Sequence, residues 1–272
     1  MPTTRRHTVS ASLRRCASAP LASLKDDCVD QLRDYADDRL VHGCVYCSVG
    51  GEETRDHVPS RVLLDPPLPT NLPVVPACFA CNNSFAPDEE YLACLIECAI
   101  AGSTDPEHIQ RPLVAHILRR TPALRSRIES AKSITDGQVF FIAEEARVKT
   151  VILKLARGHA AFELSWPLRQ EPNSVMWWPV SLMTDQEKES FDAAYITPIF
   201  GEVGSRGMQR LLVSQVKLQS RTGQASTIDL LVNDWVDVQD GRYRYLAIHD
   251  NNEIKIKIVI AEFLACEVTW AT

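Results

Sequence analysis

Two Cys-x-x-Cys motifs restrict the possible folds of this chain more than any other feature. Cys44 and Cys47 form the first motif, Cys78 and Cys81 form the second, and residues 48–77 lie between them. Each such turn presents two thiolates, and two turns together give a tetrahedral site of four sulfurs. Such a site leaves no coordination position open for a substrate, so the pattern predicts a structural Zn²⁺ ion.

The other cysteines and the start of the chain agree with a metal site in a reducing compartment. The chain has nine cysteines, and its first residues include no apolar stretch of secretory length. Thiols in a reducing compartment bind metals more often than they form disulfides, so we expect a cytoplasmic protein. Cys94 and Cys98 have the spacing to share a metal on one helix. Small core residues are the favoured interpretation of these two, as of the isolated Cys16, Cys28 and Cys266.

Charge and hydropathy argue against two classes of protein. No run of about 18 apolar residues occurs, so a membrane-spanning protein is not expected. The net charge of −6 counts against a protein that coats nucleic acid by bulk attraction, although it leaves room for a local basic groove. One stretch is locally basic, and we interpret it as a solvated helix face rather than a nucleic-acid-binding patch: Arg111, Arg119, Arg120, Arg125, Arg127 and Lys132.

Local patterns predict an α+β fold in two parts. Residues 1–24 are expected to form a disordered tail, residues 25–134 a first domain, and residues 135–272 an α+β accessory domain. In the first domain we expect helices over Asp26–His42 and Asp88–Ile100, and two short helices with Pro112 and Pro122 at their first positions. Thr121 is expected to cap the second of these.

In the C-terminal part, helix and strand signals follow one another. We expect a strand over Val139–Ile142 and a helix over Ala146–Arg157 that Gly158 ends. Thr184 and Glu187 form a capping-box pattern ahead of a helix that reaches Tyr195. Alternating isoleucines predict a strand over residues 254–260, with residues 251–252 as the turn before it.

Two C-terminal segments carry motifs that we interpret as structural. Gly201–Gly207 lacks the Lys-Ser/Thr ending of a phosphate-binding P-loop, so an ordinary glycine-rich loop is favoured. Trp235–Tyr245 mixes aromatic residues with arginines, as single-strand-binding platforms do. Packed strand aromatics around an Asp240-Gly241 turn are the favoured interpretation of this segment.

The residues between and just after the two cysteine motifs include the candidates for a catalytic site. They include Thr54-Arg55-Asp56-His57-Val58-Pro59, then Asn71-Leu72, and Asn82-Asn83 directly after the fourth cysteine. A histidine beside an aspartate is on its own more often structural than catalytic. A loop pinned by zinc is rigid, however, and a catalytic base needs such rigid support.

Taken together, this stretch resembles an HNH endonuclease of the ββα-metal type, over roughly residues 44–91. The resemblance implies that residues 25–134 hold a nuclease domain in which two strands and a helix bind one catalytic cation. It implies that Asp56 is a metal ligand, that His57 is the general base, and that Asn71 orients His57. Asn82 would be the second metal ligand, at a position where many members of the family have histidine. Arg55, Ser60 and Arg61 flank this site and could contact phosphates, and their interpretation as surface residues without a partner is equally open.

The chemistry of phosphodiester hydrolysis agrees with these roles. A neutral imidazole can take a proton from water near pH 7, and a cation can stabilise charge on the phosphate and the leaving oxygen. Because Asp56 and Asn82 both offer oxygen, we expect the cation to be Mg²⁺ or Mn²⁺. The expected partner is nucleic acid, with DNA favoured over RNA. A homodimer or an effector partner could bind through the C-terminal domain.

Two other classes of function are weighed against the nuclease. A non-catalytic zinc module that binds nucleic acid or protein would keep the four cysteines but would need neither Asp56 nor His57. A thiol redox protein that uses Cys44 and Cys47 is a remote alternative, because the second matched motif fits zinc better than disulfide exchange.

Overall fold

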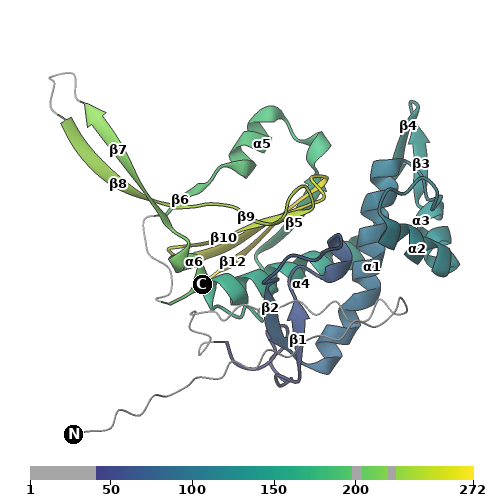
Figure 1. Cartoon of the computed structure of the whole chain (residues 1–272), viewed down its shortest axis with the longest axis horizontal. Helices are drawn as coiled ribbons and strands as arrows, with labels where there is room; N and C mark the ends of the chain where they lie inside the picture. The colour runs from purple at the N-terminus through teal and green to yellow at the C-terminus, as the bar shows by residue number, and fades with distance from the viewer. Residues whose placement is uncertain (1–40, 198–203, 220–224) are drawn as a thin grey trace, which may run out of the picture.

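The protein is described by a computed structural model that covers residues 41–197, 204–219 and 225–272 (Figure 1). Helices and strands mix along the described residues, as an α+β fold requires. The expected tail at residues 1–24 and the expected helix from Asp26 to residue 40 lie outside these ranges, as does the start of the Gly201–Gly207 loop. Within the described residues, no helix combines the length and the apolar character that crossing a membrane demands.

The first folded unit is a two-stranded hairpin followed by a long helix. Strands β1 (Thr54–His57) and β2 (Val74–Ala77) pair antiparallel, with His57 opposite Val74. A short 3-10 helix, η2 (Arg61–Leu63), lies in the connection between them. Helix α1 (Phe79–Ala101) begins directly after β2. The expected start of this helix at Asp88 is wrong, because the Cys78 side chain caps it earlier by accepting the amide of Cys81.

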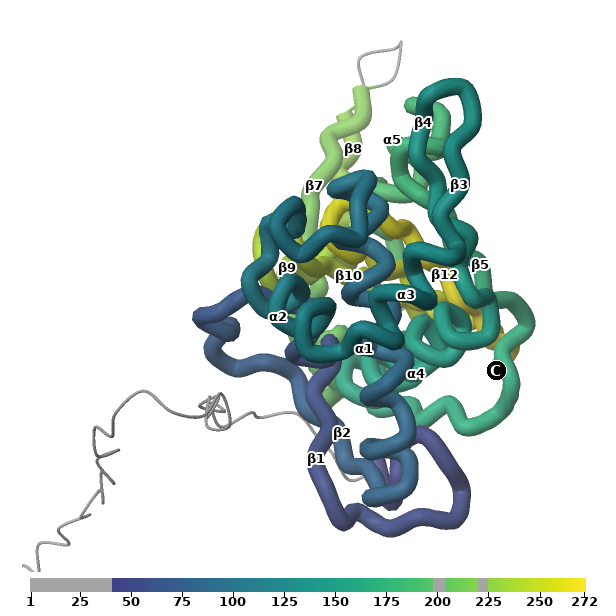
Figure 2. Tube along the Cα trace, turned by 90° about the vertical axis from the view of Figure 1, so that its right-hand side faces the viewer, coloured from purple at the N-terminus to yellow at the C-terminus, as the bar shows by residue number. Residues whose placement is uncertain are grey.

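Two short helices and a second hairpin lie on the side of α1 away from the large sheet (Figures 1 and 2). Helices α2 (Pro112–Arg120) and α3 (Pro122–Ser130) begin at their prolines, as predicted. Thr121 precedes α3, but its side chain makes no capping hydrogen bond. Strands β3 (Lys132–Thr135) and β4 (Gln138–Phe141) form the hairpin. The domain boundary suggested near residue 134 therefore lies inside this hairpin.

Helix α4 (Glu145–Leu164) runs between the first unit and the large sheet (Figure 1). It contacts α1 and β2 on one side, and β10 and β11 on the other. The expected end at Gly158 is wrong, since the helix continues through this glycine. A Cβ atom at Gly158 would lie 2.5 Å from Cγ2 of Val58, so this glycine allows close packing rather than a helix end.

The large sheet is antiparallel, with the order β5-β12-β11-β10-β9. Its strands are β5 (Ser174–Pro179), β9 (Val236–Gln239), β10 (Tyr243–Asp250), β11 (Glu253–Ile260) and β12 (Leu264–Ala271). The predicted alternation in β11 is confirmed: Ile254, Ile256 and Ile258 are buried in the same core as α4. The turn at residues 251–252 is confirmed too, with Asn251 at a φ of 51°. Tyr243 and Tyr245 are buried, so the 235–245 segment is packed as expected.

The remaining elements include a helix over the outer face of this sheet, a second sheet of three strands, and a short helix that contacts α4. Helix α5 (Asp185–Asp192) follows the short η3 (Val180–Leu182) and starts with the predicted capping box, although it ends before Tyr195. Strands β6 (Tyr195–Thr197), β8 (Ala225–Asn233) and β7 (Leu212–Gln219) form a sheet in that order, and α6 (Arg206–Gln209) precedes β7. The β7–β8 hairpin projects away from the body (Figure 1).

Candidate functional site

The four cysteines of the two motifs meet at one point. Their Sγ atoms all lie within 4.8 Å of one another, and those of Cys47 and Cys78 are 3.9 Å apart. Backbone amides donate to the sulfurs, as from Gly50 to Cys47 at 3.3 Å and from Cys81 to Cys78 at 3.4 Å. Such bonds favour the thiolate form that binds metal. The predicted cluster is thus confirmed, and four sulfurs at this separation fit a metal such as Zn²⁺.

Gly50 makes room for this cluster. A Cβ atom there would lie 2.4 Å from Cβ and 2.6 Å from Sγ of Cys78. Only glycine therefore allows the 44–50 turn to approach the second motif so closely. The amide of Gly50 is also the main reason why the pKa of the Cys47 thiol is lowered to about 7.

The cluster fixes the base of the β1–β2 hairpin and the start of α1. The amide of Val45 donates to the carbonyl of Pro76 in β2 at 3.1 Å, and Cys78 is the N-cap of α1. Thr54 donates through Oγ1 to the carbonyl of Ala77 at 2.9 Å. The start of β1 and the end of β2 are therefore held by residues that neighbour the cysteines in the chain.

Asp56 is buried and already has polar partners. Tyr46 donates its hydroxyl to Oδ2 at 2.7 Å. The Lys154 ammonium lies 3.2 Å from Oδ1 and 3.0 Å from Oδ2. The nearby carboxylate is the second cause, after burial, of the strongly raised pKa of Tyr46, which therefore stays a hydrogen-bond donor.

Lys154 is the residue of this site that sequence reasoning missed. It lies in α4, it is 1% exposed, and its Nζ also contacts Glu89 Oε1 at 2.9 Å, Ser60 Oγ at 2.8 Å and the His57 carbonyl at 3.1 Å. Ser60 in turn donates to Glu89 at 2.5 Å. No sequence signal separates this lysine from exposed ones, because only the packing of α4 onto β1 brings it here.

His57 is half-buried at the end of β1. Burial lowers its pKa below the usual 6.5, and the nearby Arg61 lowers it further. The imidazole is consequently neutral at pH 7 and can accept a proton.

The two asparagines lie in different settings. Asn82, in the first turn of α1, donates through Nδ2 to Thr54 Oγ1 at 3.0 Å and to the Arg55 carbonyl at 3.5 Å. These two contacts place Asn82 beside β1, and its role as a metal ligand stays a prediction. Asn71 lies in the turn before β2 with a left-handed φ of 61°. Its bracing of His57 stays a prediction. Arg55 and Arg61 are both exposed.

The cationic stretch from Arg111 to Lys132 is largely paired with acidic residues. Arg119 contacts Glu107 at 2.6 Å, Arg120 contacts Glu90 at 3.2 Å, and Arg127 contacts Glu144 at 2.9 Å. Arg111 is buried and donates to Asp65 at 2.6 Å. These contacts favour the interpretation of a helix surface over that of a nucleic-acid groove.

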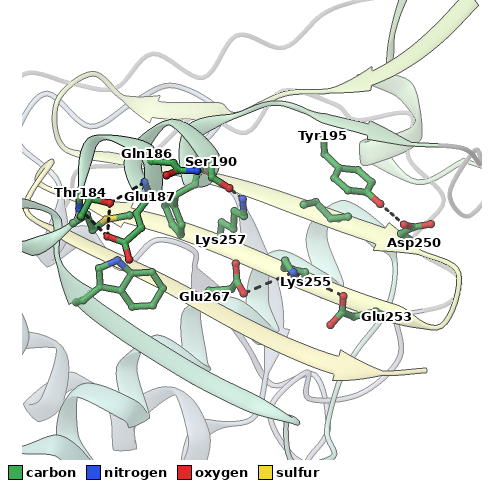
Figure 3. Close-up of a pocket in the computed structure, with 14 residues that line it drawn as sticks. Thr184, Gln186, Glu187, Ser190, Tyr195, Asp250, Glu253, Lys255, Lys257 and Glu267 are labelled. Atoms are coloured by element: carbon green, nitrogen blue, oxygen red, sulfur yellow. Dashed lines mark hydrogen bonds and ion pairs between the residues drawn. The ribbon is translucent and has the colours of Figure 1, made fainter.

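A large cavity of about 710 Å³ lies elsewhere, between α5 and the outer face of the large sheet (Figure 3). It is lined by none of the site residues expected from the sequence. Its polar groups pair among themselves: Lys255 lies between Glu253 and Glu267, at 3.9 and 3.7 Å, and Tyr195 donates to Asp250. We therefore place the candidate site at the end of β1.

Comparison of the chain with protein-family models, with curated proteins and with solved structures finds no match. The function is therefore inferred from the residues of this chain and their geometry.

Proposed function

We propose that the protein is a metal-dependent endonuclease of the HNH type that hydrolyses phosphodiester bonds of nucleic acid, with DNA as the favoured substrate. The observation that carries the proposal is the strand–strand–helix unit, in which Asp56 and His57 end a strand whose base is fixed by four clustered cysteines. A rigid strand end is a suitable support for a catalytic base.

His57 acts as the general base in this proposal. Its lowered pKa keeps the imidazole neutral at pH 7, so that it can take the proton of the attacking water. Arg55 and Arg61, both exposed, bind phosphates on either side of the bond that is cut.

Asp56 and Asn82 would hold the cation, and their surroundings can accept one. Asp56 and Glu89 carry two negative charges against the single charge of Lys154, which leaves this cluster of three residues with one net negative charge. A carboxylate offers about four acceptor sites, and the contacts of Tyr46 and Lys154 with Asp56 take three of them. A bound Mg²⁺ or Mn²⁺ would supply Lewis-acid stabilisation of the phosphate and of the leaving oxygen.

A second candidate function is a non-catalytic zinc module that binds nucleic acid or protein. The Asp56–Lys154 ion pair favours it, because a buried bridge of this kind can serve as a structural link alone. The module would need the cysteine cluster but would not need His57.

Cleavage of supercoiled plasmid in Mg²⁺, Mn²⁺ or EDTA separates the two functions. We expect metal-dependent nicking or linearisation by the wild type, and a loss of about 10²- to 10⁴-fold in rate for His57→Ala. The exposed His116→Ala is the matched control, and zinc content is measured for every variant. A wild-type protein that is inert on both DNA and RNA, or a His57→Ala variant that cuts at the control rate, would overturn the nuclease proposal.

A further inference from the structure

We propose that Lys154 is a positioning residue of the nuclease site: through its ammonium group, α4 holds the Asp56 carboxylate and the His57 backbone in the orientation needed for hydrolysis. This inference rests on the proposed function and deepens it. It also makes the helix at residues 145–164 part of the site, although the sequence assigns this helix to the accessory domain.

The first observation is the set of oxygens around the ammonium. Five oxygen atoms from four residues lie within 3.2 Å of Nζ: Ser60 Oγ, Glu89 Oε1, both carboxylate oxygens of Asp56, and the His57 carbonyl. An ammonium has three N–H donors, so its donors are fully used or shared. A buried charge with partners on several sides cannot rotate away without leaving charges unpaired. The Lys154 ammonium is therefore held in one position, and it holds the Asp56 carboxylate in one orientation.

The second observation is a further contact of α4 with the same strand end. Gly158 follows Lys154 by one helical turn and lies on the same side of α4. It packs so closely against Val58 that an added Cβ would be 2.5 Å from Cγ2 of Val58. One helix thus contacts the residues on both sides of His57, together with the His57 carbonyl. The backbone from which the His57 imidazole projects is therefore held by α4.

Stability alone is a weak explanation for a buried ammonium here. An apolar side chain of similar volume often replaces a buried ion pair with little loss of stability. The charge has a further effect at this site, because it offsets part of the negative charge of Asp56 and Glu89. It thereby limits how tightly a divalent cation is attracted, while it holds the ligand in place.

The Lys154→Met variant should show an unusual pair of changes. The variant should keep its zinc and bind Mn²⁺ at least as tightly as the wild type, because two carboxylates lose their neutralising partner. Its cleavage rate at saturating metal should nevertheless fall about 10²-fold, since small misplacement of reacting groups has effects of this size. Mn²⁺ affinity is measured by electron paramagnetic resonance, and the rate by single-turnover plasmid cleavage.

Two other variants complete the test. Glu163→Gln changes a buried charge of α4 that pairs with Arg210 at 2.7 Å, away from the site, and should cleave at the wild-type rate. Ser60→Ala removes one contact of the ammonium and should slow cleavage about tenfold with Mn²⁺ affinity unchanged. It replaces Lys154→Met as the test if that variant loses zinc or unfolds.

The outcomes separate this inference from the proposed function. Wild-type cleavage rates in both Lys154→Met and Ser60→Ala would overturn the inference and leave the nuclease intact. Loss of Mn²⁺ binding together with loss of cleavage would overturn the inference as well. Lys154 would then be needed for cation binding itself rather than for orienting Asp56 and His57. A wild-type protein that neither binds Mn²⁺ nor cuts nucleic acid would overturn the proposed function and this inference with it.

Discussion

His159 is a fully buried histidine whose surroundings oppose a positive charge. Its Nε2 lies 2.7 Å from the Tyr243 hydroxyl, and its ring stacks on Tyr245. Burial, and then the charges of Lys154 and Arg210, lower its pKa well below 6.5. Among the described residues, its Nδ1 has no hydrogen-bond partner, so protonation would also bury an unpaired N–H. The folded chain therefore keeps this imidazole neutral.

This depressed pKa predicts a loss of stability in mild acid. The unfolded chain takes up a proton below about pH 6.5 while the folded chain does not, so the contribution of His159 is complete above that pH and is lost as the pH falls. The loss should be about 0.7 kcal/mol per pH unit at pH 6.5, where half of the unfolded chains carry this proton, and should approach about 1.4 kcal/mol per pH unit at lower pH. We expect urea unfolding of the wild type to show this additional slope between pH 6.5 and 5.5, and His159→Gln to lack it.

The exposed His116→Gln variant is the control for this experiment, and it should keep the wild-type slope. Equal slopes in the wild type and His159→Gln would show that His159 is protonated in the folded chain, against the expectation.

At the scale of single residues, the candidate metal ligands could be predicted from the sequence better than the residues that hold the site in place. Cys44, Cys47, Cys78 and Cys81 could be found because metal ligands recur at fixed spacings. The role of Gly50 could not be predicted, because it depends on Cys78, which is distant in sequence. Lys154 could not be predicted as a site residue, since its partner Asp56 lies 98 residues away in the chain.

At the scale of helices and strands, local signals worked where the cause is local. The prolines that start α2 and α3, the capping box of α5 and the alternation of β11 all act within a few residues. The start of α1 was wrong because its cap is a cysteine, which is not among the residues that usually cap helices, and the end of α4 was wrong because its cause is not local. Cys78 of the four-cysteine cluster caps α1, and α4 continues through Gly158, where a side chain would collide with Val58.

The contact between α4 and β1 leads to a prediction about Gly158. Alanine there adds a Cβ 2.5 Å from Cγ2 and 2.9 Å from Cγ1 of Val58. Overpacking of this kind costs typically ~1–3 kcal/mol, while alanine gains about 1 kcal/mol over glycine within a helix. We expect Gly158→Ala to lower the free energy of unfolding, as measured by urea titration.

The cost of this substitution should largely disappear when Val58 is shortened. In a Val58→Ala background the two Cγ atoms are gone and the nearest remaining side-chain atom is the Cβ of residue 58, at 3.2 Å, so the gain of about 1 kcal/mol in helix propensity offsets most of the remaining cost. A double-mutant cycle measures the coupling between the two positions. If Gly158→Ala has the same effect in both backgrounds, the close contact of α4 with the end of β1 is not present in solution.

At the scale of the whole molecule, polar contacts join the two parts that the sequence separates near residue 134. Arg242, next to the β9–β10 turn, donates to Glu97 of α1 at 2.6 Å and lies 3.3 Å from Asp65. Gln239 exchanges two hydrogen bonds of 2.8 Å with the backbone of Asp65. One hydrophobic core also includes residues from both sides, such as Tyr91 and Trp270. These contacts join residues that are distant in the chain, so few of them could be predicted from local sequence patterns.

These shared contacts predict that the cysteine cluster and the large sheet unfold together. All five tryptophans lie after residue 165, so their fluorescence reports the C-terminal part, whereas zinc release to a chromogenic chelator reports the cluster. Because α4 packs against both parts, melting of either one exposes apolar surface of the other. We expect the two midpoints to coincide in thermal unfolding of the zinc-loaded protein. Release of zinc well below the fluorescence transition would instead establish an independently folding N-terminal domain and restore the boundary near residue 134.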